Sequence, residues 1–167
     1  MSLAPVYGTA PRLLKTCSSN LAVVIDVTIA SNDNERNALL LLKSMETGSL
    51  LATVERLCTE DFSWENSGLP TVNGQEELRK LVASGGFRAH IPIITNTRRF
   101  EADVLHIASS GDVVFTERID HFWDAEGRDL MTPRIGGVIE FRDGKICSMR
   151  EYYDTACYSQ EPTTPSR

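Results

Sequence analysis

The sequence predicts an α+β fold: a curved antiparallel β-sheet forming a cone, with about three N-terminal helices packed over its concave face. Two observations support this prediction. Residues 33–83 carry apolar residues at helical spacing around one short strand-like stretch, and four long strand-like stretches follow residue 90. The turn sequences SSGD, DAEG and RDGK separate those stretches and would join them as antiparallel hairpins. Helices followed by an antiparallel meander are typical of α+β domains.

The three helices each have recognisable ends. SNDNERNALLLLKSMETG at 31–48 opens with residues that cap helices and closes with Gly48, which suits a helix terminus. Ser49 would cap a second short helix within LLATVERLC at 50–58. GQEELRKLVASGG at 74–86 predicts a third helix that ends at a glycine pair.

The strands are predicted from alternation. DFSWEN at 61–66 reads as a short strand with Phe62, Trp64 and Asn66 on one face, because side chains alternate along a strand. The strands of the meander are expected at 97–110, 112–124, 128–142 and 145–155. A strongly curved sheet covered by helices makes a cone, and its concave side is the natural pocket.

A single domain is predicted over residues 31–158. Residues 1–30 are predicted to be an N-terminal arm or an extra strand, partly disordered, and residues 159–167 a disordered tail, since both ends are rich in Pro, Ser and Thr. The apolar run LAVVIDVTIA at 21–30 contains Asp26 and is too short to cross a bilayer. It also lacks the basic flank and cleavage site of a signal peptide.

The composition excludes several classes of function. The 167 residues carry a net charge of −6, which argues against nucleic acid binding, and no run of Lys or Arg would pair with anionic lipid. The four cysteines fit no CxxC metal or redox spacing and are interpreted as free thiols in a reducing cytosol; they are Cys17, Cys58, Cys147 and Cys157. We therefore expect a cytoplasmic protein with no nucleic acid or membrane partner.

Motifs for metal and nucleophilic chemistry are absent from the sequence. His90, His106 and His121 are too scattered to form a set of metal ligands. No GxSxG nucleophile motif and no glycine-rich phosphate loop occurs. The sequence therefore predicts no metal site.

The stretch FTERIDHFW at 115–123 places Arg118 and Asp120 on one face of a strand, together with Phe122. Glu151 on the last strand could face the same cavity. One arginine between two buried carboxylates leaves a net charge of −1, so one acid would tend to hold a proton. The site would then contain an acid and a base. Most Arg-x-Asp pairs on strands are instead solvated ion pairs, and the pattern alone leaves that alternative open.

The order of several motifs resembles that of limonene-1,2-epoxide hydrolase and its relatives, within the cone-shaped superfamily of polyketide cyclases and ketosteroid isomerases. The resemblance covers residues 33–158, about three quarters of the chain. The matching segments are FSWENSGLP at 62–70 followed by NGQEEL, HIASSGDVVFTERID at 106–120, GGVIEFRDGKI at 136–146 and REYYD at 150–154.

This resemblance implies a set of catalytic residues. Arg118 would be the bridging arginine, Asp120 the acid that protonates the epoxide oxygen, and Asn66 a water-holding asparagine. Glu151 stands where the family usually has the aspartate base, and its extra methylene can move the carboxylate by about an ångström. Trp64 stands where the family has a tyrosine that holds water, so it is expected to help position the water, although its indole N–H donates but cannot accept a hydrogen bond.

The implied reaction is hydrolysis of a small apolar or terpenoid-like epoxide to a vicinal diol, by one-step attack of an activated water without a cofactor. The parity of the strands and helices gives candidates for the apolar wall of the pocket, for each of which core packing is the alternative: Phe122, Leu78, Leu81, Val82, Leu130 and Val138. The resemblance also implies a homodimer formed through the open face of the sheet. Alternating Phe115, Ile119 and Trp123 would suit that interface.

Two other functions fit the same fold. One is an isomerase or cyclase of a biosynthetic pathway, in which a carboxylate moves a proton and no water enters the product. The other is a small-molecule-binding module without turnover. The fold itself does not choose among these functions, because cone folds host all of them.

Overall fold

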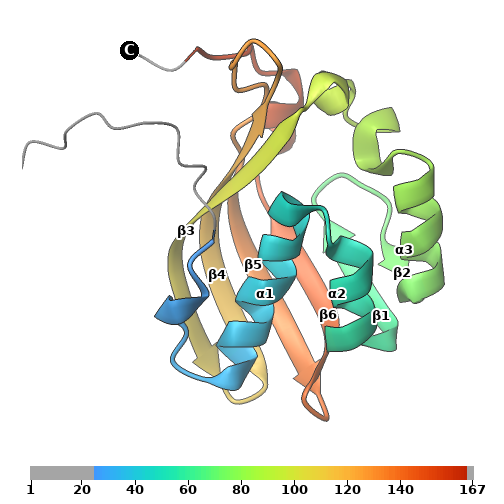
Figure 1. Ribbon diagram of the computed structural model, residues 1–167, viewed down its shortest axis with the longest axis vertical. Helices are drawn as coiled ribbons and strands as arrows, with labels where there is room; N and C mark the ends of the chain where they lie inside the picture. Colours follow the sequence, from blue (N-terminus) through green and yellow to red (C-terminus); the bar gives the residue numbers. More distant parts are fainter. Residues whose placement is uncertain (1–24, 165–167) are drawn as a thin grey trace, which may run out of the picture.

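The computed structural model describes residues 25–164, and Figure 1 labels its helices and strands. The α-helices of this part are α1 (Asp33–Thr47), α2 (Leu50–Leu57) and α3 (Gly74–Ala83). The strands are β1 (Cys58–Asn66), β2 (Val72–Asn73), β3 (Arg99–Ser110), β4 (Val113–Trp123), β5 (Arg134–Arg142) and β6 (Lys145–Tyr152). Short 3₁₀ helices lie at η1 (Val27–Ile29), η2 (Gly86–Ala89), η3 (Pro92–Asn96) and η4 (Thr155–Ser159).

The strands form one sheet in the order β2-β1-β6-β5-β4-β3. The meander from β3 to β6 is antiparallel, as the turn sequences predict. The β1–β6 pair is parallel, so the sheet is mixed and not wholly antiparallel as expected. Local turn signals could not show this pairing, because a parallel pair requires a long crossover. Here that crossover includes everything between β1 and β6.

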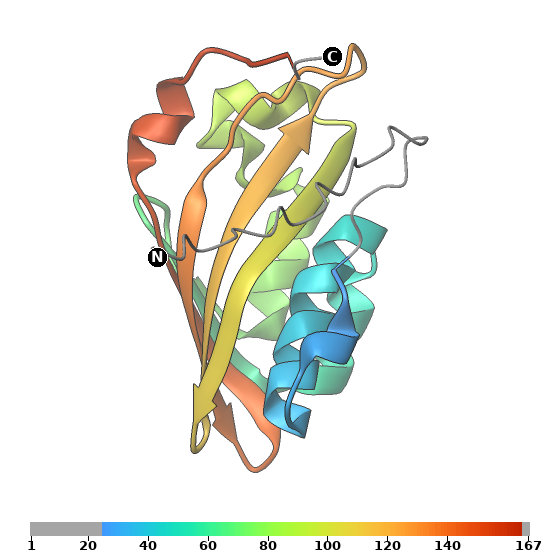
Figure 2. The ribbon, with the colours of Figure 1, turned by 90° about the vertical axis from the view of Figure 1, so that its left-hand side faces the viewer.

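All three α-helices lie on one face of the sheet, and the sheet curls around them without closing (Figure 2). Helix α1 packs on β3 and β4, and α3 packs on β1. The predicted α+β cone with three helices is therefore confirmed. Its apolar core fills the space between the helices and the sheet and includes Leu39, Leu42, Val54, Phe62, Leu78, Ile139, Ile146 and Met149.

The ends of α1 follow the predicted chemistry. The side chain of Asn32 accepts a hydrogen bond from the backbone N–H of Glu35 over 3.0 Å, and the Glu35 carboxylate accepts from Ser31 N over 2.7 Å. Gly48 ends the helix in the left-handed conformation, with φ of 70°. Ser49 precedes α2 but makes no capping hydrogen bond, because its hydroxyl pairs with that of Thr47.

The connection after β4 is longer than a hairpin turn, and β5 begins at residue 134 instead of the expected 128. Asp124 closes the turn by accepting hydrogen bonds from Glu126 N and Arg128 N over 3.0 and 2.8 Å. Asp129 then exchanges backbone hydrogen bonds with Thr163, from the segment predicted to be a disordered tail. The polar composition of residues 159–167 could not predict this pairing, because backbone N–H and C=O groups make it and not side chains.

The N-terminal prediction falls only partly on described residues. Residues 1–24, with Cys17 and the start of the apolar run, lie outside them. Residues 27–29 form a 3₁₀ turn and not an extra strand. Ile25 is buried against the core and donates its backbone N–H to Glu46 Oε2 over 2.9 Å, so this end is attached to α1.

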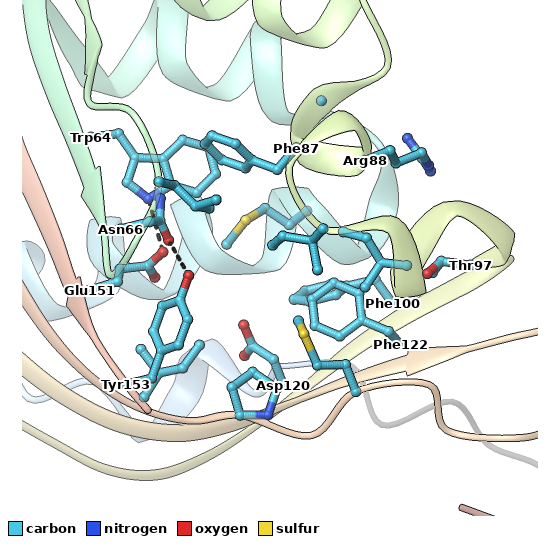
Figure 3. Close-up of a pocket in the computed structure, with 18 of the residues that line it drawn as sticks. Trp64, Asn66, Phe87, Arg88, Thr97, Phe100, Asp120, Phe122, Glu151 and Tyr153 are labelled. Carbon is cyan, nitrogen blue, oxygen red and sulfur yellow. Dashed lines mark hydrogen bonds between the residues drawn. The ribbon is translucent and has the colours of Figure 1, made fainter. Parts of the chain in front are cut away.

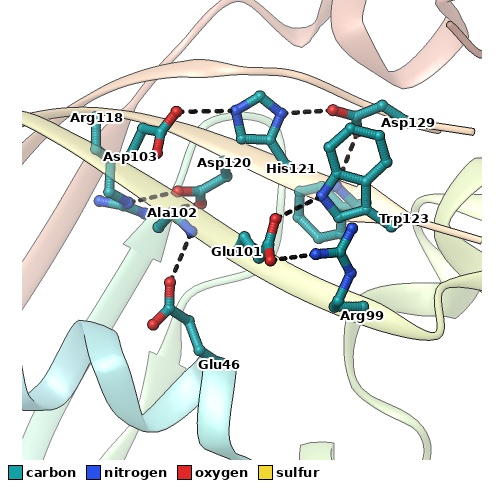
Figure 4. Close-up of polar contacts among 11 residues, drawn as sticks. Glu46, Arg99, Glu101, Ala102, Asp103, Arg118, Asp120, His121, Trp123 and Asp129 are labelled. Carbon is teal, nitrogen blue, oxygen red and sulfur yellow. Dashed lines mark hydrogen bonds and ion pairs between the residues drawn. The ribbon is translucent and has the colours of Figure 1, made fainter. Parts of the chain in front are cut away.

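The outer face of the sheet carries the residues expected at a dimer interface. Phe115 is 46% exposed there. The indole N–H of Trp123 donates to Glu101 over 2.9 Å, and His121 stacks on its ring (Figure 4). The face therefore combines apolar and polar groups, and the homodimer stays a prediction. Within residues 25–164, no helix has the length and apolar character needed to span a bilayer.

Candidate active site

A cavity of about 240 Å³ opens between the inner face of the sheet and the segments η2 and η3 (Figure 3). Most of its wall is apolar and comes from Phe87, Ile91, Ile94, Phe100, Phe122 and Met131. Six polar residues line it from the sheet, on β1, β4, β6 and directly after β6: Trp64, Asn66, Arg118, Asp120, Glu151 and Tyr153. Arg88 and Thr97 line it as well. An apolar hollow with a few convergent polar groups is the usual form of a small-molecule site.

Arg118, Asp120 and Glu151 meet in this cavity. Arg118 Nε donates to Asp120 Oδ1 over 2.8 Å, and Nη2 donates to Asp120 Oδ2 over 3.2 Å. The same Nη2 donates to Glu151 Oε1. The three residues are only 1%, 4% and 3% exposed, so this is not the solvated ion pair that was the alternative.

The register of the sheet explains how the three side chains meet. Arg118 and Asp120 share the inner face of β4, while Glu151 lies two strands away on β6. Gly137 of β5 is the register partner of Glu151, and it has no side chain to fill the space between them. A Cβ placed there would lie 3.6 Å from Arg118 Nη1 and 2.4 Å from Thr116 Oγ1. The glycine leaves the gap through which Arg118 reaches Glu151.

Burial and charge together set the protonation of this group. Burial away from solvent is the main cause of the raised pKa of Asp120, which is about 6. The positive charge of Arg118 lowers this pKa, and the negative charge of Glu151 raises it further. Burial alone would lower the pKa of Arg118, but the two carboxylates outweigh it and raise that pKa, so the guanidinium stays charged. Asp120 is thus suited to hold a proton near neutral pH, as an acid must.

Asn66 and Trp64 hydrogen-bond to Oε2, the second carboxylate oxygen of Glu151. The amide of Asn66 satisfies its neighbours when Nδ2 donates to Glu151 Oε2 over 2.8 Å and its oxygen accepts from Trp64 Nε1 over 2.9 Å. Trp64 Nε1 also lies 2.9 Å from Glu151 Oε2. The structure therefore places the Trp64 N–H on Glu151 and Asn66, whereas the sequence suggested that it would hold a water.

Only Phe122 of the six predicted wall residues lines the cavity. Leu78 is fully buried in the core, and Val82 on α3 is 40% exposed and does not line the cavity. Leu81 packs against the core, and Leu130 is buried without lining the cavity. Val138 lies on the outer face with Arg134, opposite to its predicted direction, because Gly137 occupies the inner position.

Sequence reasoning missed Tyr153 and the wall residues from the segment between α3 and β3. That segment, FRAHIPII at 87–94, is apolar but shows neither helical nor strand periodicity. An apolar stretch between two regular elements is a signal that it covers something. Within residues 25–164, no three His, Cys, Asp or Glu side chains are grouped so that they could hold a metal ion.

A family model described as the limonene-1,2-epoxide hydrolase catalytic domain matches residues 32–160. The chain belongs to the limonene-1,2-epoxide hydrolase family. The match spans both strands that carry the buried cluster and the β1 strand that carries Asn66.

Solved structures support the fold. An LEH-like epoxide hydrolase of M. tuberculosis is 22% identical, with a TM-score of 0.59 over 75% of this chain and 86% of that one. TerC, co-crystallised with polyporic acid, is 18% identical, with a TM-score of 0.60 over 76% and 95% of the two chains. A putative SnoaL-like polyketide cyclase from Jannaschia sp. CCS1 is 15% identical, with a TM-score of 0.58 over 86% and 100%. At these identities the similarities show the fold alone.

The gap at Gly137 can be tested by Gly137→Ala. The added Cβ must displace the hydroxyl of Thr116, so we expect a loss of about 2 kcal/mol in the free energy of unfolding, measured by urea denaturation. Thr116→Ala in the same chain removes the 2.4 Å contact and should restore most of the loss. Gly136→Ala is the matched control, because its Cβ would face outward, 3.9 Å from the nearest atom. Equal stability of the two single variants would show that Gly137 is not constrained.

The raised pKa of Asp120 predicts a pH-dependent stability. The folded pKa is about 6 and the ordinary value 3.8, so the contribution of this group is present below pH 3.8 and lost as the pH rises through 6. The loss is roughly 3 kcal/mol at full ionisation. Asp120→Asn lacks this titration. We therefore expect the variant to gain stability relative to the wild type between about pH 4 and pH 7, measured by denaturation across that range; a constant difference would contradict the pKa of Asp120.

Proposed function

We propose that this protein is an epoxide hydrolase that converts a small, largely apolar epoxide to a vicinal diol by one-step attack of an activated water. The observation that supports this most is the buried cluster of Asp120, Arg118 and Glu151 at the wall of an apolar cavity. Membership of the limonene-1,2-epoxide hydrolase family agrees with it. We propose Asp120 as the acid, Glu151 as the base and Arg118 as the bridge between them.

The proton balance of this site suits the reaction. With Asp120 protonated, Glu151 ionised and Arg118 charged, the cluster is neutral before the reaction. Water attacks one epoxide carbon while Glu151 takes a proton from it, and Asp120 gives its proton to the opening oxygen. The cluster is again neutral afterwards, so no net charge has to develop in a dry site. Proton exchange between the two acids through solvent restores the starting state.

The wall of the cavity supports an apolar substrate. Three phenylalanines, Phe87, Phe100 and Phe122, face the space with aliphatic side chains between them. Phe100 and Phe122 contact edge to face at 5.1 Å, which fixes both rings. A compact hydrocarbon group bearing an epoxide would bury its surface there and present the epoxide oxygen to Asp120.

An isomerase or cyclase is the second candidate. The observation that favours it is Trp64, whose N–H is occupied by Glu151 and Asn66 in place of a hydroxyl that would hold water. In such an enzyme the same two acids would move a proton on the substrate, and the product would contain no oxygen from water.

Two further properties remain proposals. The protein is proposed to act in the cytoplasm without a cofactor. It is also proposed to form a homodimer through the outer face of the sheet, where Phe115 is exposed.

Incubation with a panel of small apolar epoxides in heavy-oxygen water tests the proposed function. We expect a vicinal diol carrying one heavy oxygen, detected by mass spectrometry. Asp120→Asn and Glu151→Gln should each lower turnover by at least about 100-fold, because each removes one proton-transfer group. Both variants are expected to stay folded.

The matched controls are Asp112→Asn in the β3–β4 turn and Glu140→Gln on the outer face of β5, which should keep wild-type turnover. A product without heavy oxygen would support the isomerase or cyclase. Rapid diol formation by Asp120→Asn or Glu151→Gln would remove that residue from the mechanism.

A further inference from the structure

Among the six polar residues of the sheet that line the cavity, Tyr153 is the one to which no role has yet been given. It lines the cavity one residue after β6, beside Glu151 and Asn66 (Figure 3). Its Oη lies 3.5 Å from the end of the Asn66 amide that faces Glu151. It is also 2.9 Å from the hydroxyl of Tyr158.

The direction of the hydrogen bonds around Tyr153 is fixed. Tyr158 Oη donates its hydrogen to the backbone oxygen of Ser67 over 2.7 Å. Tyr158 has only one hydroxyl hydrogen, so it can only accept from Tyr153. The hydrogen of Tyr153 is therefore directed out of the cavity, toward Tyr158. What Tyr153 offers to the cavity is the lone pairs of its oxygen.

Trp64, in contrast to Tyr153, can only donate a hydrogen bond. Its indole nitrogen has one hydrogen and no lone pair to accept with. That hydrogen is shared between Glu151 Oε2 and the Asn66 oxygen, each at 2.9 Å. Trp64 therefore orients the base and has no group left for a water.

The remaining bonding capacity matches one water molecule. Glu151 Oε2 already accepts from Trp64 and Asn66, whereas Oε1 accepts only from Arg118 among the described residues. Oε1 thus has a free lone pair, and Asn66 Nδ2 has a second hydrogen. A water can donate to Glu151 Oε1 and to Tyr153 Oη and accept from Asn66. Its second lone pair is then free to attack.

We propose that Tyr153 is a catalytic residue that accepts a hydrogen bond from the attacking water, supplying the oxygen that Trp64 lacks. This inference rests on the proposed hydrolase activity. The water forms a bond to an epoxide carbon and loses one proton to Glu151. The other hydrogen stays on the new hydroxyl and remains bonded to Tyr153. The carbon–oxygen bond of the epoxide breaks with its electron pair on oxygen, which takes the proton of Asp120.

The test compares Tyr153→Phe with Tyr152→Phe, using an epoxide that the wild type converts to diol. Tyr152 is the adjacent tyrosine, 56% exposed on the opposite face of β6, and its variant should match the wild type. Tyr153→Phe should lower kcat about 10- to 30-fold, as expected for one lost hydrogen bond to a reacting group, and leave KM within about twofold. Its melting temperature should stay within about 3 °C of the wild type.

Tyr158→Phe supplies the second arm. It removes the acceptor of the Tyr153 hydrogen, which can then turn into the cavity and compete with the water. We expect a smaller fall in kcat than for Tyr153→Phe. The double variant should be no slower than Tyr153→Phe alone, because Tyr158 acts only through Tyr153.

Each outcome has one meaning. Wild-type kcat in Tyr153→Phe would overturn the role of Tyr153 while leaving the hydrolase intact. A fall in kcat accompanied by an equal rise in KM and a lower melting temperature would also overturn it, since Tyr153 would then be structural. A wild-type protein that forms no labelled diol would overturn the proposed function, and this inference with it.

Discussion

The burial of the Arg118 guanidinium between two carboxylates is the interaction on which the rest of this structure depends. A guanidinium that is 1% exposed is tolerated only because Asp120 and Glu151 compensate its charge and accept its hydrogens. Those partners come from strands two positions apart in the sheet, so the register of β4, β5 and β6 must be correct for the charge to be paired. Glycine at 137 belongs to the same arrangement, because a Cβ there would touch Arg118 Nη1 at 3.6 Å and clash with Thr116 Oγ1 at 2.4 Å.

The same arrangement links stability to chemistry. Two carboxylates and one guanidinium in a dry site leave an excess negative charge when all three are ionised. That excess charge is removed when one of the two acids holds a proton. Asp120 carries the proton in our account because it is buried beside a second carboxylate. An apolar replacement of the cluster would remove the cost of burying charge, and such replacements are often neutral or stabilising. Retaining three ionisable groups here is therefore more readily explained by a function than by stability.

The sequence predicted the parts of this protein that depend on local rules. The meander, the ends of α1 and the shared inner face of Arg118 and Asp120 follow from turn sequences, capping residues and the alternation of strands. The strand reading allowed Glu151 to face the same cavity, and family resemblance suggested the roles of Glu151 and Asn66. The structure places Glu151 against Arg118 and Asn66 against Glu151. The parallel β1–β6 pair, the wall from η2 and η3 and the bond from Trp64 to Glu151 were not predicted. These depend on which distant segments meet, and no periodicity in one segment encodes that.

Measuring the pKa of Asp120 tests the central claim most directly. The aspartate carboxyl carbons can be labelled with carbon-13 and followed by NMR as the pH is raised, with Asp120→Asn identifying the signal. The account predicts that the Asp120 carboxyl titrates near pH 6, well above the ordinary value of 3.8. A signal of Asp120 that titrates at or below the ordinary value would contradict the account, because Asp120 would then hold no proton to give to the epoxide oxygen.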